Sequence, residues 1–190
     1  MEVKALKFGG LTAKRPIVQG GMGVGVSLSS LAGNVAKCGG IGTLSGVHPG
    51  YKEADFKENP FRANLRAIGN ELEKAKEIAN GGIIGFNFMT VMNHYEEYVK
   101  EAIAAGADFI VSGAGLPVNL AKYAAGTRAA ILPIVSSARA LKLIVKQWQR
   151  ADRLPDAVVV EGPLAGGHLG YPYGHLVDGT FDTLEDSLVD

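Results

Sequence analysis

The sequence predicts an α/β protein with parallel strands, a (β/α)8 or TIM barrel of which about the first six β/α units are present. Short apolar runs alternate with segments whose apolar residues recur every three or four positions, as in parallel strands covered by helices. The 26 glycines among 190 residues cluster just after the apolar runs, where the chain has to turn sharply or approach a ligand. Because special residues follow nearly every run, a barrel is favoured over the alternative, an open doubly wound sheet.

The predicted elements follow in chain order. The first strand ends in Gly20-Gly21-Met22-Gly23, and Ser27 or Ser29 is placed to cap a helix that buries Cys38 on its apolar face. Ser137 is placed to cap the last helix. The predicted strands are 16–19, 41–44, 83–88, 109–111, 130–135 and 157–160. The predicted helices run from Ser27 or Ser29 to Cys38, and over 61–78, 95–105 and 141–148, and a polar stretch without a seventh strand follows over 178–190.

Composition and charge exclude several classes of function. Lys plus Arg and Asp plus Glu both number 19, so the chain lacks the basic excess with which proteins bind nucleic acid or anionic membranes. The single Cys38 excludes an internal disulfide framework, and no His or carboxylate pair has the spacing of metal ligands. We therefore expect no metal, nucleic-acid or membrane partner. The start of the chain has no apolar run of signal-peptide length, so the expected location is the cytoplasm.

Two polar or glycine-rich features have both a functional and a structural interpretation. The loop 20–25 has G-x-G spacing, but Val26 stands where a dinucleotide fingerprint requires glycine. Close approach of its backbone to a flat ring is the preferred interpretation, and a plain tight turn is the alternative. Asn87, between Phe86 and Phe88, is either a hydrogen-bonded core amide or a ligand-facing amide at the end of a strand.

The most specific local feature is the loop after the last predicted strand. There His168 directly follows Gly166 and Gly167, and an imidazole can accept or donate a proton at neutral pH. His168 is therefore a candidate acid or base, with an incidental loop histidine as the alternative. Ser112 and Gly113 begin a second loop in which glycines allow backbone amides to face a ligand.

Five segments occur in the order seen in one enzyme family. They are PIVQGGM (16–22), GGIG (39–42), GFN (85–87), SGAG (112–115) and EGPLAGGHLG (161–170). The sequence resembles the FMN-dependent nitronate monooxygenases, formerly called 2-nitropropane dioxygenases. It is closely similar to the flavin-dependent enoyl-acyl-carrier-protein reductases of the same barrel superfamily. The resemblance runs from residue 16 to about residue 170.

The resemblance implies roles for individual residues. It places Gly20, Gly21 and Met22 against the isoalloxazine ring of FMN and Asn87 in a hydrogen bond to it. Glu161 and Gly166, with Gly167 beside them, match flavin-contacting positions. His168 matches the catalytic histidine, and Ser112 and Gly113 are expected beside the substrate.

Three functions stay open, two from the resemblance and the third from the missing pair of β/α units. The first is oxidation of small alkyl nitronates by O2 through FMN. The second is an enoyl-acyl-carrier-protein reductase that uses NAD(P)H. The sequence Gln19-Gly20-Gly21-Met22 favours this function, and so does Glu161, which stands where nitronate monooxygenases commonly have glutamine. The third is a non-catalytic truncated barrel that binds a ligand or a complementary chain.

The expected domain organisation is a single FMN-binding barrel domain over 1–190. The family's phosphate-binding loops belong to the last two β/α units, and these units have no counterpart in this sequence. We expect the intact protein to continue beyond Asp190 to more than about 300 residues, with strands seven and eight supplying those loops. Association into a homo-oligomer stays open.

Overall fold

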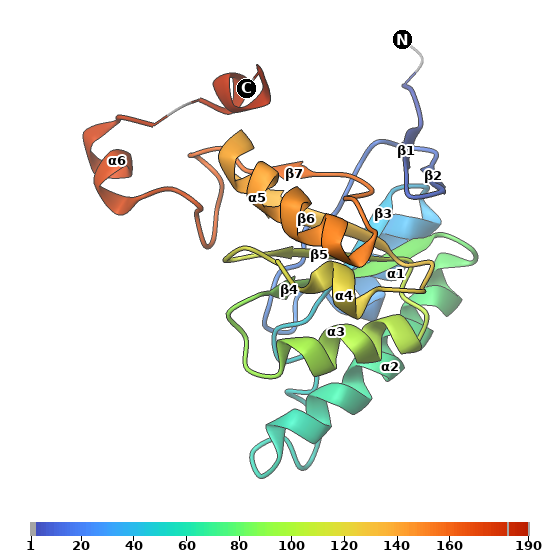
Figure 1. Cartoon of the computed structure of the whole chain (residues 1–190). Coiled ribbons are helices and arrows are strands. Elements are labelled where there is room, and N and C mark those ends of the chain that lie inside the picture. The colour runs from blue at the N-terminus through green and yellow to red at the C-terminus, as the bar shows by residue number, and fades with distance from the viewer. Residues whose placement is uncertain (1–2, 182, 190) are drawn as a thin grey trace.

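A curled sheet of parallel strands forms the centre of the computed structural model, which describes residues 3–181 and 183–189. Its five strands lie side by side in the order β3-β4-β5-β6-β7 (Figure 1). They are β3 (Ile41–Ser45), β4 (Ile83–Met89), β5 (Phe109–Gly113), β6 (Ala130–Val135) and β7 (Val159–Val160). A sixth parallel segment precedes them, because Val18 forms a parallel bridge with Ile41. Six parallel segments in chain order make an open part of a (β/α)8 barrel, which confirms the predicted fold.

The helices between the strands cover the outer face of the sheet (Figure 1). They are α1 (Ser29–Lys37), α2 (Pro60–Ala79), α3 (Tyr95–Ala104), α4 (Leu120–Tyr123) and α5 (Ala138–Trp148), and a 3-10 turn over Gln149–Ala151 follows α5. Asn59 caps α2 by accepting the N–H of Arg62. Ser137 caps α5, as predicted, by accepting the N–H of Ala140 at 3.3 Å. Two short helices follow β7, namely α6 (Tyr173–Asp178) and α7 (Leu184–Val189). None of the described helices is both long and apolar enough to span a bilayer.

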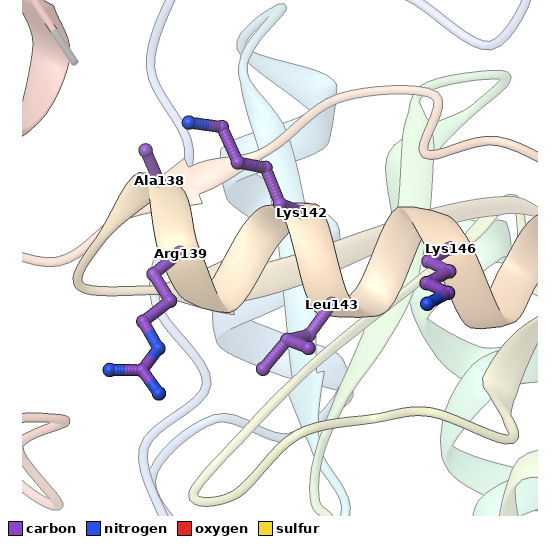
Figure 2. A pocket seen from close by; sticks show the side chains of 5 residues that line it. All are labelled: Ala138, Arg139, Lys142, Leu143 and Lys146. Atoms are coloured by element: carbon purple, nitrogen blue, oxygen red, sulfur yellow. The ribbon is translucent and has the colours of Figure 1, made fainter.

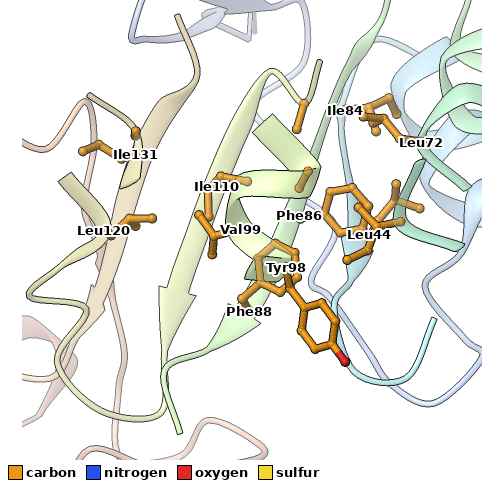
Figure 3. Close-up of a cluster of buried hydrophobic side chains, with 14 of the residues drawn as sticks. Leu44, Leu72, Ile84, Phe86, Phe88, Tyr98, Val99, Ile110, Leu120 and Ile131 are labelled. Atoms are coloured by element: carbon orange, nitrogen blue, oxygen red, sulfur yellow. The ribbon is translucent and has the colours of Figure 1, made fainter. Parts of the chain in front are cut away.

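Alternate residues of each strand are buried on opposite faces of the sheet. On the outer face, Leu44, Phe86 and Ile110 pack beneath the helices (Figure 3). On the inner face, Phe109 and Leu132 belong to a separate cluster. A strand that is buried on both faces has an uninterrupted run of apolar residues in its sequence. The sequence therefore predicts these strands clearly.

A hairpin that the sequence analysis missed closes the amino-terminal end of the inner cluster. It consists of β1 (Leu6–Phe8) and β2 (Leu11–Ala13), paired antiparallel. The Phe8 ring packs edge-on against Phe109, with centroids 6.2 Å apart. Gly9 has φ +51°, and a Cβ at this residue would lie 2.6 Å from the Cβ of Ala130. The turn therefore requires glycine both for its conformation and for its close approach to β6.

The first β/α unit differs from the prediction. Ser27 does not cap α1, whose N-cap is Leu28 without a side-chain hydrogen bond. Cys38 is exposed rather than packed, because α1 buries its small residues Ala32, Gly33 and Ala36 instead. The reason is close helix packing: a Cβ on Gly33 would lie 2.7 Å from the Cβ of Ile78 on α2.

The segment predicted as the first strand, 16–19, is only partly strand-like. It pairs with β3 through a single bridge, and its side chains Ile17 and Val18 are exposed. The polar stretch after residue 178 forms the helix α7 over most of its described part. Apolar residues at helical spacing, Leu184 and Leu188, are the signal that the sequence offered for it.

Two aspartates, Asp108 and Asp156, join neighbouring strands at their amino-terminal ends. Asp108 Oδ2 accepts the N–H of Ile84 on β4 at 2.8 Å, and Asp156 Oδ2 accepts the N–H of Ile131 on β6 at 2.8 Å. Asp108 directly precedes β5 and Asp156 lies shortly before β7. Each carboxylate therefore fixes the register of its own strand against the preceding one.

Replacing Asp108 by alanine is expected to lower the free energy of unfolding by about 2 kcal/mol, because the N–H of Ile84 loses its acceptor. The change also removes the ion pair with Lys76, whose Nζ lies 3.1 Å from Oδ1. Urea denaturation measures the effect. The matched change Asp178→Ala, at an exposed position, should stay within about 0.5 kcal/mol of the parent protein. Equal losses in the two variants would contradict the role assigned to Asp108.

Candidate functional site

A cavity of about 450 Å³ lies at the carboxyl ends of β5, β6 and β7. The loops after these strands line it, and two of the predicted site residues, Glu161 and His168, are among its walls. The other lining residues are Val91, Ala114, Gly115, Leu116, Ile134, Val135, Ser136, Ser137, Ala140, Leu169 and Gly170. In parallel α/β folds this end of the sheet carries the functional loops. The structure therefore brings the candidate acid or base into the expected place.

A second hollow, of about 560 Å³, lies on the outer face of α5 and is lined by that helix alone. Figure 2 shows Lys142 on one side of the helix and Arg139 and Lys146 on the other, spaced apart along it. Since these side chains do not converge and none follows a strand, this hollow carries no candidate chemistry.

The loop that bears His168 is fastened to the strand ends two residues further along. The Glu161 carboxylate accepts the N–H of Gly170 at 2.8 Å, and the Ser136 hydroxyl donates to the carbonyl of the same residue at 2.7 Å. The Tyr171 hydroxyl donates to the Glu161 carbonyl at 3.0 Å. His168 itself is exposed. Neither Ser136 nor Tyr171 belongs to a recognisable motif, so their roles were not predicted from the sequence.

The glycine-rich loop after the first parallel segment lies over Asn87. A Cβ on Gly21 would stand 2.6 Å from the Cβ of Asn87 and 3.2 Å from its Nδ2. Asn87 pairs in register with Val111, which belongs to the inner cluster, so its side chain faces the barrel interior. Among the described residues its amide has no hydrogen-bond partner. This geometry favours the ligand-facing interpretation of Asn87 over a satisfied core amide.

Ser112 lies away from the cavity. Its hydroxyl donates to the Phe88 carbonyl at 2.8 Å and lies 2.9 Å from the Tyr95 hydroxyl, on the helix side of the sheet. Ser112 is fully buried. Gly113 packs against β6, since a Cβ there would lie 2.9 Å from the side chain of Ile134. The substrate contacts expected of Ser112 and Gly113 stay a prediction, and the two residues after them line the cavity instead.

Because of the buried Tyr95 hydroxyl beneath this loop, we expect the stability of the folded protein to depend on pH in the alkaline range. Burial raises the pKa of Tyr95 from 10.0 to about 12, against the opposing effect of its hydrogen bond to Ser112. Between these values the unfolded chain loses the phenol proton while the folded chain keeps it, so stability falls as pH rises. The loss should approach about 2 kcal/mol at the upper end.

Urea denaturation at pH values below and within this window measures that fall. Tyr95→Phe cannot ionise, so it should show a correspondingly smaller loss than the parent protein. An identical pH dependence in both proteins would contradict this prediction.

The family model for nitronate monooxygenase matches residues 4–190. The chain belongs to the nitronate monooxygenase family. Several solved structures share its fold. FabK from Thermotoga maritima has a TM-score of 0.65 and 23% sequence identity, covering 84% of this chain and 44% of its own.

Nitroalkane oxidase from Streptomyces ansochromogenes has a TM-score of 0.61 and 20% identity, covering 91% of this chain and 54% of its own. The chain therefore spans about half the length of these structures. At such identities the likeness shows the fold alone. No curated protein sequence matches the chain.

The cofactor that the nitronate monooxygenase family implies is a flavin, and the described residues fit its ring. Around Gly20, Gly166 and Gly167, the described residues other than each glycine and its chain neighbours place no heavy atom within 4 Å of the position of a Cβ, so a flat ring can approach the backbone. The open amide of Asn87 lies beside the first of these loops. The cavity walls include no lysine or arginine that would hold a phosphate. Within residues 3–181 and 183–189, no group of three His, Cys, Asp or Glu is placed to hold a metal ion.

Proposed function

We propose that this chain is a flavin-dependent oxidoreductase that uses FMN and oxidises small alkyl nitronates with O2. The observation that carries the proposal is the cavity at the carboxyl ends of the strands, where Glu161 and His168 stand among glycine-rich loops. Membership of the nitronate monooxygenase family supports the oxidoreductase class.

Different residues of this chain would contact the cofactor and the substrate. Gly20, Gly21 and Met22 would lie against the flavin ring, and the free amide of Asn87 would hydrogen-bond one of its polar atoms. Gly166 and Gly167 would let the second loop approach the same ring. FMN, when bound there, would supply two-electron redox chemistry between the substrate and O2.

His168 would act on the substrate rather than on the ring. Its imidazole would take the α-proton from a neutral nitroalkane, or donate a hydrogen bond to a nitronate oxygen. Apolar walls of the cavity, including Val91, Leu116 and Ile134, would hold the alkyl group and exclude water from it.

Purified protein supplied with FMN tests the proposal directly. Because the phosphate-binding loops have no counterpart in this sequence, we expect weak binding, seen as a change in flavin fluorescence when FMN is titrated. With FMN in excess, the protein should consume O2 when propyl-2-nitronate is added. Protein that binds flavin and reacts with no nitronate would contradict the substrate, and protein that binds no flavin even at high FMN concentration would contradict the cofactor. The second result would favour the non-catalytic barrel.

A second candidate function is the enoyl-thioester reductase, favoured by the carboxylate of Glu161 in place of an amide. Its discriminating assay is anaerobic. NADH or NADPH should bleach the bound flavin, and a crotonyl thioester should restore its colour. If neither nucleotide reduces the flavin, the reductase is excluded.

A further inference from the structure

The side chain of Gln19 continues the strand pairing of the first parallel segment after its backbone has turned away. The Ile41 N–H donates to the Ile17 carbonyl at 2.9 Å, and the Gln19 N–H donates to the Ile41 carbonyl at 3.0 Å. The next two ladder bonds come from the side chain instead. Gln19 Oε1 accepts the Thr43 N–H at 3.0 Å, and Gln19 Nε2 donates to the Thr43 carbonyl at 3.0 Å.

In a regular parallel ladder these two bonds would use the carbonyl of Gln19 and the N–H of Gly21. Because the side-chain amide supplies both, the backbone is free to leave β3 at Gly20 while β3 keeps its hydrogen bonds. A glutamine has the reach and the paired donor and acceptor for this substitution.

The hydroxyl of Ser27 holds both ends of the short loop that results. It donates to the Gly20 carbonyl at 3.1 Å and accepts from the Met22 N–H at 2.8 Å and from Gln19 Nε2 at 2.8 Å. One hydroxyl has a single proton and two lone pairs, so these three bonds use its full capacity. Ser27 is fully buried, and its own carbonyl accepts the Ser45 N–H at 2.9 Å.

This bracing fixes the loop where a planar ligand would meet it. Gly21 is pressed against Asn87, whereas the Met22 side chain is 46% exposed. The anchored side of the loop is thus buried in the protein and its other side is open. A surface held in its binding conformation before the ligand arrives saves the entropy of ordering it later.

From these contacts we infer that Gln19 and Ser27 are positioning residues that set the affinity for the flavin ring by holding Gly20–Met22 over Asn87. The inference rests on the proposed function for its ligand. Its structural part, the bracing of the loop, can be measured without any ligand.

Three variants of the full chain test the inference. Gln19→Glu keeps the shape and the acceptor of the side chain but places an oxygen against the Thr43 carbonyl and the Ser27 hydroxyl. Ser27→Ala removes the central hydroxyl. Gln147→Glu makes the same chemical change as the first variant on the exposed face of α5, and serves as the control.

Hydrogen exchange of the Met22 amide in flavin-free protein is the first readout. We expect it to quicken at least about tenfold in Gln19→Glu and Ser27→Ala, because its acceptor is displaced or lost. Amides of β5 should keep their protection, which shows that the fold is intact. Gln19 is only half-buried, so its variant decides the matter if Ser27→Ala proves unstable.

The second readout is the dissociation constant for FMN, followed by flavin fluorescence. It should rise about tenfold in both variants and stay unchanged in Gln147→Glu. Unchanged exchange at Met22 would overturn the inference, and so would faster exchange with unaltered FMN affinity. If the parent protein binds no FMN, the proposed function fails. The exchange of the Met22 amide still tests whether Gln19 and Ser27 hold the loop in place.

Discussion

His168→Ala is expected to lower the turnover of a nitroalkane at least about 100-fold, the loss usual for removing a general acid or base. The reason is positional: the imidazole stands in the wall of the cavity at the carboxyl ends of the strands. Its loop is fastened at Gly170 by Glu161 and Ser136, so alanine should remove the proton acceptor without moving the backbone. Oxygen uptake at saturating substrate measures the change.

The matched control is His175→Ala. His175 is an exposed histidine of α6 outside the cavity walls, and its loss should leave turnover unchanged. Flavin content should be equal in the parent protein and both variants, so that a difference in rate reports on chemistry. Turnover retained in His168→Ala would remove this residue from the mechanism.

Gly21→Ala is expected to weaken the binding of FMN about tenfold or more. The new Cβ would stand 2.6 Å from the Cβ of Asn87, a distance at which one of the two backbones has to move. Overpacking of this kind typically costs about 1–3 kcal/mol, and the displaced groups are the two that we propose for the flavin ring. Fluorescence titration with FMN measures the loss.

Gly69→Ala provides the comparison for this variant. It adds the same methyl group on α2, where the nearest atom, Glu101 Oε1, is 3.9 Å away, so FMN affinity should not change. Thermal unfolding separates a local effect of Gly21→Ala from a global one. An FMN affinity equal to that of the parent protein would show that the loop does not contact the cofactor.

The parts of the fold that the sequence predicted well are those with long, uninterrupted patterns. The strand Ala130–Val135 has the predicted bounds, and α2 differs from its prediction by one residue at each end. The hairpin β1–β2 was missed because each of its strands has only three residues, too few to show alternation. The Gly9-Gly10 dipeptide between two short apolar runs is a hairpin signal that was present in the sequence but was not used.

The site was harder to predict because strands that are buried on both faces do not reveal which way a polar residue points. Asn87 and Ser112 both stand near the ends of apolar strands, yet the first faces the barrel interior and the second the helices. Contacts between distant segments were equally hidden. The pairing of Gln19 with Thr43 joins residues that no local pattern relates.

The amino-terminal hairpin also constrains the order in which the chain can be assembled during synthesis. The hairpin is synthesised before its partners Phe109 and Ala130, which lie more than a hundred residues later, and Gly9 also approaches Asp156. Its docking surface therefore does not exist until most of the sheet has been translated. Pairings across such a sequence separation form late, so we expect the hairpin to dock late against the amino-terminal ends of the strands rather than to act as a nucleus for folding.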